Sequence, residues 1–112
     1  MNTVSVIHTA FEDSPRVVAF VEVGDRKGDE ALEYAYHRTQ NLGGSWSRND
    51  FEPNPDYSED VTVMAELPVH EGVTYGLRST SMGDQMLLGN VKYKVAMCGF
   101  EVDHVYGKEN AA

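Results

Sequence analysis

The sequence predicts an α+β domain, in which a curled antiparallel sheet of five or six strands packs on one helix. Several short runs rich in β-branched residues are separated by turn residues, and a single segment has helical spacing. The length of 112 residues suits one hydrophobic core. We expect a single domain over residues 1–106 and a frayed tail over 107–112. So many short strands could also close in part into a barrel, and this alternative stays open.

The first part of the chain has the pattern of a hairpin followed by a helix. Residues 3–10 and 17–23 are rich in Val, Ile and Thr, and the polar residues between them favour a turn. The second run is apolar at successive positions, which is typical of an inner strand covered on both faces. Asp29 is placed to cap a helix that runs to about Asn41. Its apolar stripe would pack on the sheet and comprises Ala31, Leu32, Ala35, Tyr36 and Leu42.

The second half of the chain predicts a long loop and further strands. Residues 45–60 are rich in Ser, Asn, Asp, Glu and Pro, which prevents regular structure. Residues 61–67 alternate as a half-buried strand does, and residues 73–78 favour a shorter one.

A hairpin is expected around Gly89-Asn90, a dipeptide that supports a tight turn. In the register that this turn sets, Leu88 faces Val91 and Met86 faces Tyr93. The apolar alternation changes phase after Met97, which indicates a bulge at Cys98-Gly99.

Charge and cysteine content narrow the classes of partner and compartment. Nine Lys and Arg against 18 Asp and Glu give a net charge of -9, which disfavours free nucleic acid and anionic membranes as partners. Cys98 is the single cysteine, which favours a reducing, cytoplasmic location, and we interpret it as a buried hydrophobe. Glu12, Asp13 and Pro15 interrupt the first twenty residues, so neither a signal peptide nor a membrane helix is expected there.

The sequence contains no motif that identifies a reaction. There is no phosphate-binding lysine loop, dinucleotide glycine fingerprint, HExxH, paired CxxC or GxSxG. The four histidines are widely spaced, so we expect no metal and no cofactor. Glu33 and His37 lie four residues apart and are interpreted as an exposed helix pair rather than as two ligands. We therefore assign no catalytic residue.

The segment around Arg78 is the best candidate for a small-ligand site. Arg78 offers a planar fork of donors, and Ser79, Thr80 and Ser81 add hydroxyl groups, which together suit an anionic, nucleotide-like ligand. In the alternative interpretation, the hydroxyl groups satisfy the backbone of a turn and Arg78 pairs with an acidic residue.

Trp46 is a second candidate for ligand or partner binding. It lies among small residues and next to Arg48, where it could stack on a flat ligand or anchor a partner. It could equally cover the core, and the sequence does not decide between the two.

The loop over residues 45–60 combines acidic and aromatic side chains. Acidic groups steer a basic partner toward a surface and aromatic rings supply contact area, although such a run can also be a solvated loop. The candidate partner-binding residues are Asp50, Phe51, Glu52, Asp56, Tyr57, Glu59 and Asp60.

Three segments carry a resemblance to a group of small uncharacterised bacteriophage proteins. They are Ala35-Tyr36-His37-Arg38-Thr39-Gln40-Asn41, Gly44-Ser45-Trp46-Ser47 and Gly76-Leu77-Arg78-Ser79-Thr80-Ser81-Met82-Gly83-Asp84. The last segment, with Gly89, Tyr93 and Gly99-Phe100, is also loosely similar to the C-terminal module of YodL-like proteins. The resemblance covers about residues 30–103 and implies a role in an infected host, but no reaction.

These observations favour a non-enzymatic phage accessory protein that binds and modulates a host protein through its acidic surface, in host takeover or anti-defence. The first alternative is a small-ligand binder that sequesters an anionic, nucleotide-like signal at the loop of Arg78. The second is a small hydrolase of unknown type. A homo-oligomer stays open.

Overall fold

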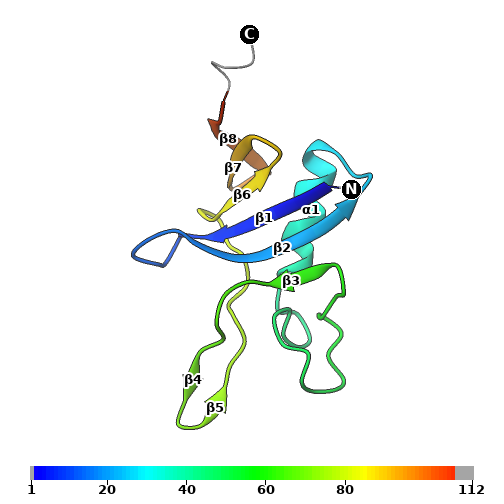
Figure 1. The fold of residues 1–112 in the computed structure, drawn as a ribbon, viewed down its shortest axis with the longest axis vertical. Coiled ribbons are helices and arrows are strands. Elements are labelled where there is room, and N and C mark those ends of the chain that lie inside the picture. Colours follow the sequence, from blue (N-terminus) through cyan, green and yellow to red (C-terminus); the bar gives the residue numbers. More distant parts are fainter. Residues whose placement is uncertain (1, 108–112) are drawn as a thin grey trace.

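The computed structural model describes residues 2–107, in which one helix packs on one face of a six-stranded antiparallel sheet (Figure 1). The sheet has the order β3-β2-β1-β6-β7-β8, and together with the helix it confirms the α+β prediction. Because β3 and β8 do not pair, the sheet is not closed and the protein does not form the alternative, a partly closed barrel. In chain order the elements are β1 (Asn2–His8), β2 (Arg16–Gly24), α1 (Gly28–Arg38), β3 (Val61–Val63), β4 (Val69–His70), β5 (Val73–Thr74), β6 (Gln85–Leu88), β7 (Val91–Val95) and β8 (Phe100–Val105).

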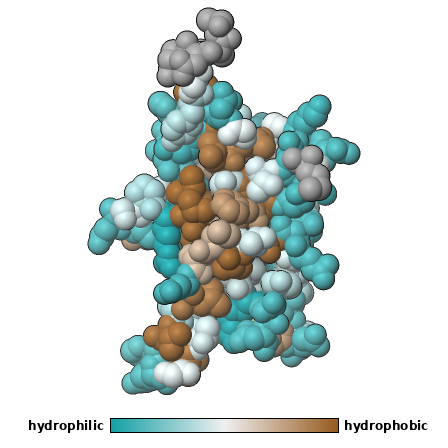
Figure 2. Space-filling model, viewed as in Figure 1, coloured by the Kyte–Doolittle hydropathy of each residue, from teal (hydrophilic) through white to brown (hydrophobic). Residues whose placement is uncertain are grey.

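Strands β1 and β2 form the predicted hairpin, with Val4 opposite Val21 and Val6 opposite Ala19. β2 lies between β1 and β3, as expected of an inner strand. The prediction that β2 is covered on both faces is wrong, because the only helix of the described chain covers one face of the sheet. Val17 and Phe20 are exposed, and Figure 2 shows a hydrophobic band across the side of the sheet that faces away from the helix.

Helix α1 packs on β1 and β2 through Ala31, Leu32 and Ala35, which are all fully buried. The sequence suggested that Asp29 caps the helix, but it does not. It lies in the first turn, where its negative charge suits the helix dipole. The helix ends at Arg38 rather than near Asn41, because the Thr39 hydroxyl donates to the Ala35 carbonyl and its N–H to the Tyr36 carbonyl. The expected stripe therefore loses Leu42, which is exposed beyond the helix end.

The hairpin of β6 and β7 has the predicted register, with Leu88 opposite Val91 and Met86 opposite Tyr93. The expected strand over 61–67 is shorter than predicted and ends at Val63, and beyond it the Met64 N–H still donates to the Val18 carbonyl of β2 at 2.8 Å. The expected strand over 73–78 is reduced to β5, which pairs with β4 in a small hairpin apart from the main sheet (Figure 1).

The segment after β7 is a chain reversal and not the predicted bulge. The Ala96 N–H donates to the Gly99 carbonyl at 2.9 Å, and β8 then runs back along β7. Cys98 lies in this reversal and is exposed, so the expectation of a buried thiol is wrong. Of the expected tail 107–112, residues 108–112 lie outside the described part. Over residues 2–107, no helix has the length and apolar character needed to cross a membrane.

Candidate functional site

Arg78 lies in the loop before β6, where two carboxylates enclose its guanidinium group. Nη1 and Nη2 donate to the two carboxylate oxygens of Asp84 at 2.8 Å each. Nε and Nη2 donate to Glu12 at 3.1 and 2.8 Å, and Nη1 also donates to the Ser79 carbonyl at 2.9 Å. A guanidinium carries five N–H donors, and these contacts use all of them.

Asp84 is the centre of this cluster and is completely buried. Its carboxylate also accepts the backbone N–H groups of Thr9 and Ala10 at 2.9 Å and of Ser81 at 2.8 Å. Burial by itself would raise the pKa of Asp84, but the hydrogen bonds from Arg78 and the three amides outweigh it and lower the pKa to about 2. The buried charge is thus compensated by hydrogen bonds on both of its oxygens.

His8 and Thr80 lie against the same cluster but are closed to solvent. The His8 Nε2 is 3.0 Å from the Thr80 hydroxyl and 3.9 Å from Asp84. Burial lowers the pKa of His8, although the Asp84 charge opposes this effect. An imidazole beside a hydroxyl is the pairing that activates a nucleophile. Here His8 is 2% exposed and Thr80 is 1% exposed, so neither reaches a substrate in this fold.

The polar groups of Ser79, Thr80 and Ser81 form hydrogen bonds within the protein. The Ser79 hydroxyl accepts the Asn41 N–H at 2.8 Å, and the Thr80 N–H donates to the Thr39 carbonyl at 3.0 Å. The Ser81 N–H is bound by Asp84. The arrangement matches the alternative interpretation of this segment, in which Arg78 pairs with acids and the loop braces a turn.

Trp46 belongs to the core and is fully buried. Its Nε1 donates to the Arg78 carbonyl at 2.9 Å, and its ring meets His8 edge-on with 6.3 Å between ring centroids. The indole therefore covers one end of the core. It has no exposed face on which a ligand or partner could stack, so this interpretation of Trp46 is wrong.

Three of the acids in the loop over residues 45–60 have structural partners. One oxygen of Asp56 accepts the backbone N–H groups of residues 42–44 at 2.6 to 2.9 Å. Asp60 accepts the Tyr34 hydroxyl, and Asp50 forms a two-pronged ion pair with Arg48 at 2.9 and 3.0 Å. Asn54 braces the same loop through Ser45 and the Arg48 carbonyl. The loop is therefore ordered by its own side chains.

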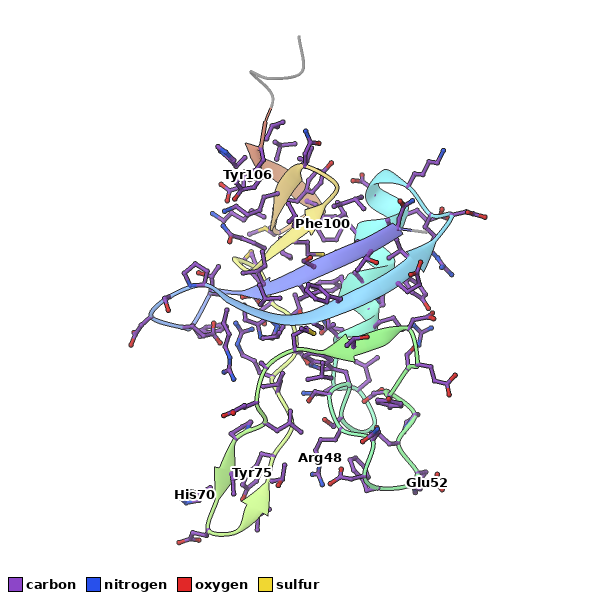
Figure 3. The ribbon with its side chains drawn as sticks, in the orientation of Figure 1. Arg48, Glu52, His70, Tyr75, Phe100 and Tyr106 are labelled. Carbon is purple, nitrogen blue, oxygen red and sulfur yellow. The ribbon has the colours of Figure 1, made fainter. Side chains whose placement is uncertain are left out.

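The two remaining acids of this loop, Glu52 and Glu59, are exposed and line an open groove with two aromatic rings. We call this feature the acidic groove. One part of it is lined by Asn49, Phe51, Glu52, Pro53, Asn54, Tyr57 and Glu59. The adjoining part shares Asn49, Tyr57 and Glu59 and reaches the edge strand β3 through Ser47, Val61, Thr62 and Val63. Figure 3 shows Arg48 and Glu52 at the end of the molecule opposite Tyr106.

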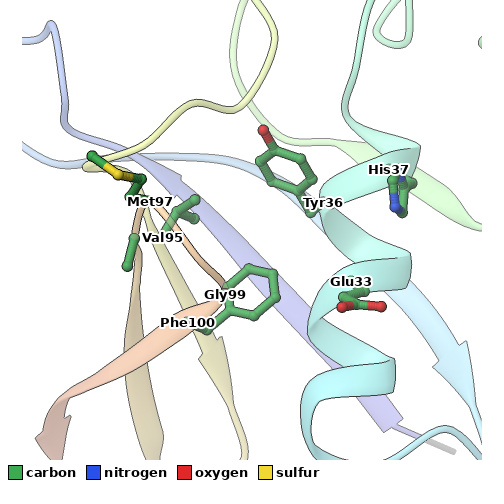
Figure 4. A pocket seen from close by; sticks show the side chains of 8 residues that line it. Glu33, Tyr36, His37, Val95, Met97, Gly99 and Phe100 are labelled. Atoms are coloured by element: carbon green, nitrogen blue, oxygen red, sulfur yellow. The ribbon is translucent and has the colours of Figure 1, made fainter.

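A smaller pocket of about 250 Å³ lies between α1 and the reversal after β7 (Figure 4). Tyr36 and Phe100 meet edge-on in it, with ring centroids 6.3 Å apart. Glu33 and His37 lie on its helix side and are both exposed, in agreement with their interpretation as a surface pair. No group of three or more metal-binding side chains occurs within the described residues 2–107.

Three residues around Arg78, namely Glu12, His8 and Asp84, were not candidates from the sequence. Glu12 lies 66 residues before Arg78, in a segment whose composition indicates only a turn. A single sequence carries no signal for so distant a pairing. The feature that could have drawn attention was a histidine at the third buried position of a strand whose other buried residues are Val4 and Val6.

Comparisons of the chain with protein-family models, curated proteins and solved structures find no match. The similarity to bacteriophage proteins therefore stays a prediction. Function is inferred from the geometry and charge of the described residues.

Proposed function

We propose that the protein is a non-enzymatic binding protein that takes a basic segment of a partner protein into the acidic groove. The observation that carries this proposal is the pairing of two exposed carboxylates, Glu52 and Glu59, with the rings of Phe51 and Tyr57 around one groove. A Lys or Arg side chain gains an ion pair from the carboxylates and a cation–π contact from a ring face. Arg48, the one cation of the loop, is paired with Asp50 and lies over the Phe51 ring, 4.9 Å from its centroid, so a partner cation would contact the Tyr57 ring or the other face of Phe51.

The groove also favours an extended shape for the bound segment, because it runs along the open edge of β3. Thr62 pairs with Phe20 on β2, and flanking backbone bonds join Met64 to Val18 and Glu22 to Asp60. Val61 and Val63 consequently direct their backbone groups toward the open edge. The Val61 N–H donates to the Ser58 carbonyl, so a partner strand would pair with Val63. Such strand addition is a common mode of peptide recognition.

The charge of the whole chain supports the same partner class. A net charge of -9 attracts basic surfaces over several ångströms and raises the rate of encounter at low salt. With the resemblance to bacteriophage proteins, we propose that the partner is a host protein in the host cytoplasm and that binding modulates it.

A small anionic ligand at the loop of Arg78 is supported less well. Such a ligand would have to displace Asp84 and Glu12 from a guanidinium that already makes five hydrogen bonds. Removing Arg78 from buried Asp84 would leave that carboxylate without its cation. A catalytic role is also unsupported, since His8 and Thr80 are both buried.

The test is the affinity of a fluorescent peptide of ten alternating Lys and Val residues, measured by anisotropy at two salt concentrations. The double variant Glu52→Gln/Glu59→Gln should bind about fivefold more weakly than wild type, because two exposed ion pairs are lost. Phe51→Ala should also weaken binding. The control Asp25→Asn/Glu30→Gln removes the same charge from exposed positions outside the groove and should bind nearly as wild type does. Equal losses in the groove variant and the control would contradict the proposal.

A further inference from the structure

The second open edge of the sheet, β8, is exposed over most of its length and has no described neighbour on its outer side. It pairs with β7 alone, and its four central residues are exposed. Val102 is 62% exposed. An edge strand of this length offers a row of backbone donors and acceptors to another strand.

The hydrogen-bond register decides which residues of β8 face outward. The Ala96 N–H bonds to Gly99 at one end of the β7–β8 pair, and the Tyr106 N–H bonds to Asn90 at the other. The alternation between these ends places Glu101 and His104 in pairs that bond to β7. Phe100, Val102 and Val105 therefore direct their backbone groups toward the open edge, with Asp103 as an extra residue between them.

This outward pattern is complementary to itself. If a second copy lies antiparallel with a two-fold axis at Val102, the two Val102 residues face each other and Phe100 faces Val105 on both sides of the axis. Between these pairs, the extra residue Asp103 and its neighbour His104 in one copy together lie opposite the single residue Glu101 of the other. All outward-directed backbone groups then meet partners in the same register.

The side chains between these positions are also complementary. Glu101 of each copy faces His104 of the other, so an imidazole N–H meets a carboxylate twice in the interface. The other acid of the strand, Asp103, is turned away, because its carboxylate accepts the Gln85 amide of β6 at 2.7 Å. Like charges therefore do not meet at the axis. A protective edge would place like charges opposite each other.

From this self-complementarity we propose that β8 is the contact surface for a second copy of the chain, and that the two sheets join into one continuous sheet of 12 strands about a two-fold axis at Val102. The interface uses the edge opposite β3. The dimer therefore leaves both acidic grooves open, at its two far ends, and this surface does not depend on the function proposed for the groove.

The mass of the full chain in solution, measured by sedimentation equilibrium over a range of concentrations, tests the proposal. We expect a monomer–dimer equilibrium that tightens with added salt, because two chains of net charge -9 repel each other. Val102→Lys places two cations at the axis and should abolish the dimer. Glu101→Lys should raise the dissociation constant about tenfold by removing two exposed carboxylate–imidazole pairs, and Glu101→Lys/His104→Glu should restore it by exchanging the partners.

The control Asp25→Lys changes the net charge by the same amount on an exposed turn. It should leave the dimer equal or tighter, because it lowers the repulsion between copies. A monomer at every concentration would overturn the proposal. So would a dimer that Glu101→Lys and Asp25→Lys affect alike, because the contact would then lie elsewhere. Thermal melting of each variant checks that the monomer remains folded.

Discussion

Replacement of Arg78 by Met should strongly lower the free energy of unfolding, because it leaves the buried carboxylate of Asp84 without its cation. Removing one member of a buried ion pair costs about 3–5 kcal/mol. We expect about 3 kcal/mol, since Asp84 keeps three backbone amides and Arg78 is 29% exposed. This expectation differs from that for a ligand-binding arginine, whose loss would spare stability. Urea unfolding at pH 7, followed by circular dichroism, measures the change.

The pH dependence of the same measurement separates the ion pair from simple loss of packing. The carboxyl of Asp84 has a pKa of about 2 when folded, against 3.8 in the absence of interactions, which corresponds to about 2.5 kcal/mol. Because the pKa of this acid is lowered on folding, its ionised form stabilises the protein above pH 3.8, and this stabilisation is lost as the pH falls toward 2. The difference in free energy of unfolding between wild type and Arg78→Met should therefore decrease by about 1 kcal/mol between pH 7 and pH 3.

Arg48→Met is the matched control, because Arg48 forms an ion pair with an exposed carboxylate. It should change the free energy of unfolding much less than Arg78→Met does, because exposed ion pairs contribute little to stability. A cost below about 1 kcal/mol for Arg78→Met at pH 7, or a gap that stays constant with pH, would refute the role assigned to the buried cluster.

Four further predictions follow from single side chains. Trp46 should emit in the blue and resist quenching by acrylamide in the native state, because it is fully buried; a red, quenchable emission would place it at the surface. Cys98 should react with a thiol reagent in native protein as fast as in urea, because it is exposed; slow native reaction would mean that the reversal is covered. Asp56→Ala should cost about 1–3 kcal/mol in urea unfolding, because three backbone amides lose their acceptor, and an unchanged midpoint would contradict this. Stability should fall as the pH drops from 6.5 to 5, because the unfolded chain takes up a proton that burial denies to His8; His8→Asn should flatten this slope in thermal melts.

Local signals predicted the elements whose stability depends on near neighbours in the chain. The Gly89-Asn90 turn fixed the register of β6 against β7, and Met86 lies opposite Tyr93 as expected. Strand ends were less predictable, because the alternation of side chains does not show where the ladder of backbone hydrogen bonds ends. The alternation continues to Leu67, whereas β3 ends at Val63 and the Met64 N–H makes one further bond to Val18 of β2. The change in the apolar alternation near Cys98 was recognised, but a chain reversal and a bulge both shift this alternation, so the sequence pattern does not distinguish them.

The candidate site was predictable by residue type but not by role. Arg78 and Asp84 stand six residues apart, and their charge made a pairing conceivable. The partner that completes the cluster, Glu12, comes from the other end of the chain. The acidic loop shows the same limit, because only the structure separates Asp56, which binds three amides, from Glu52 and Glu59, which face solvent.

The central position of β1 dictates when the chain can fold. β1 is the first strand to leave the ribosome, but one of its two neighbours, β6, begins at Gln85. The carboxylate that holds the amides at the end of β1 lies 75 residues later, at Asp84. A nascent chain therefore has to keep its valine-rich first hairpin from aggregating until β6 has been synthesised, and loop closure over this distance makes folding slow compared with that of small helical proteins.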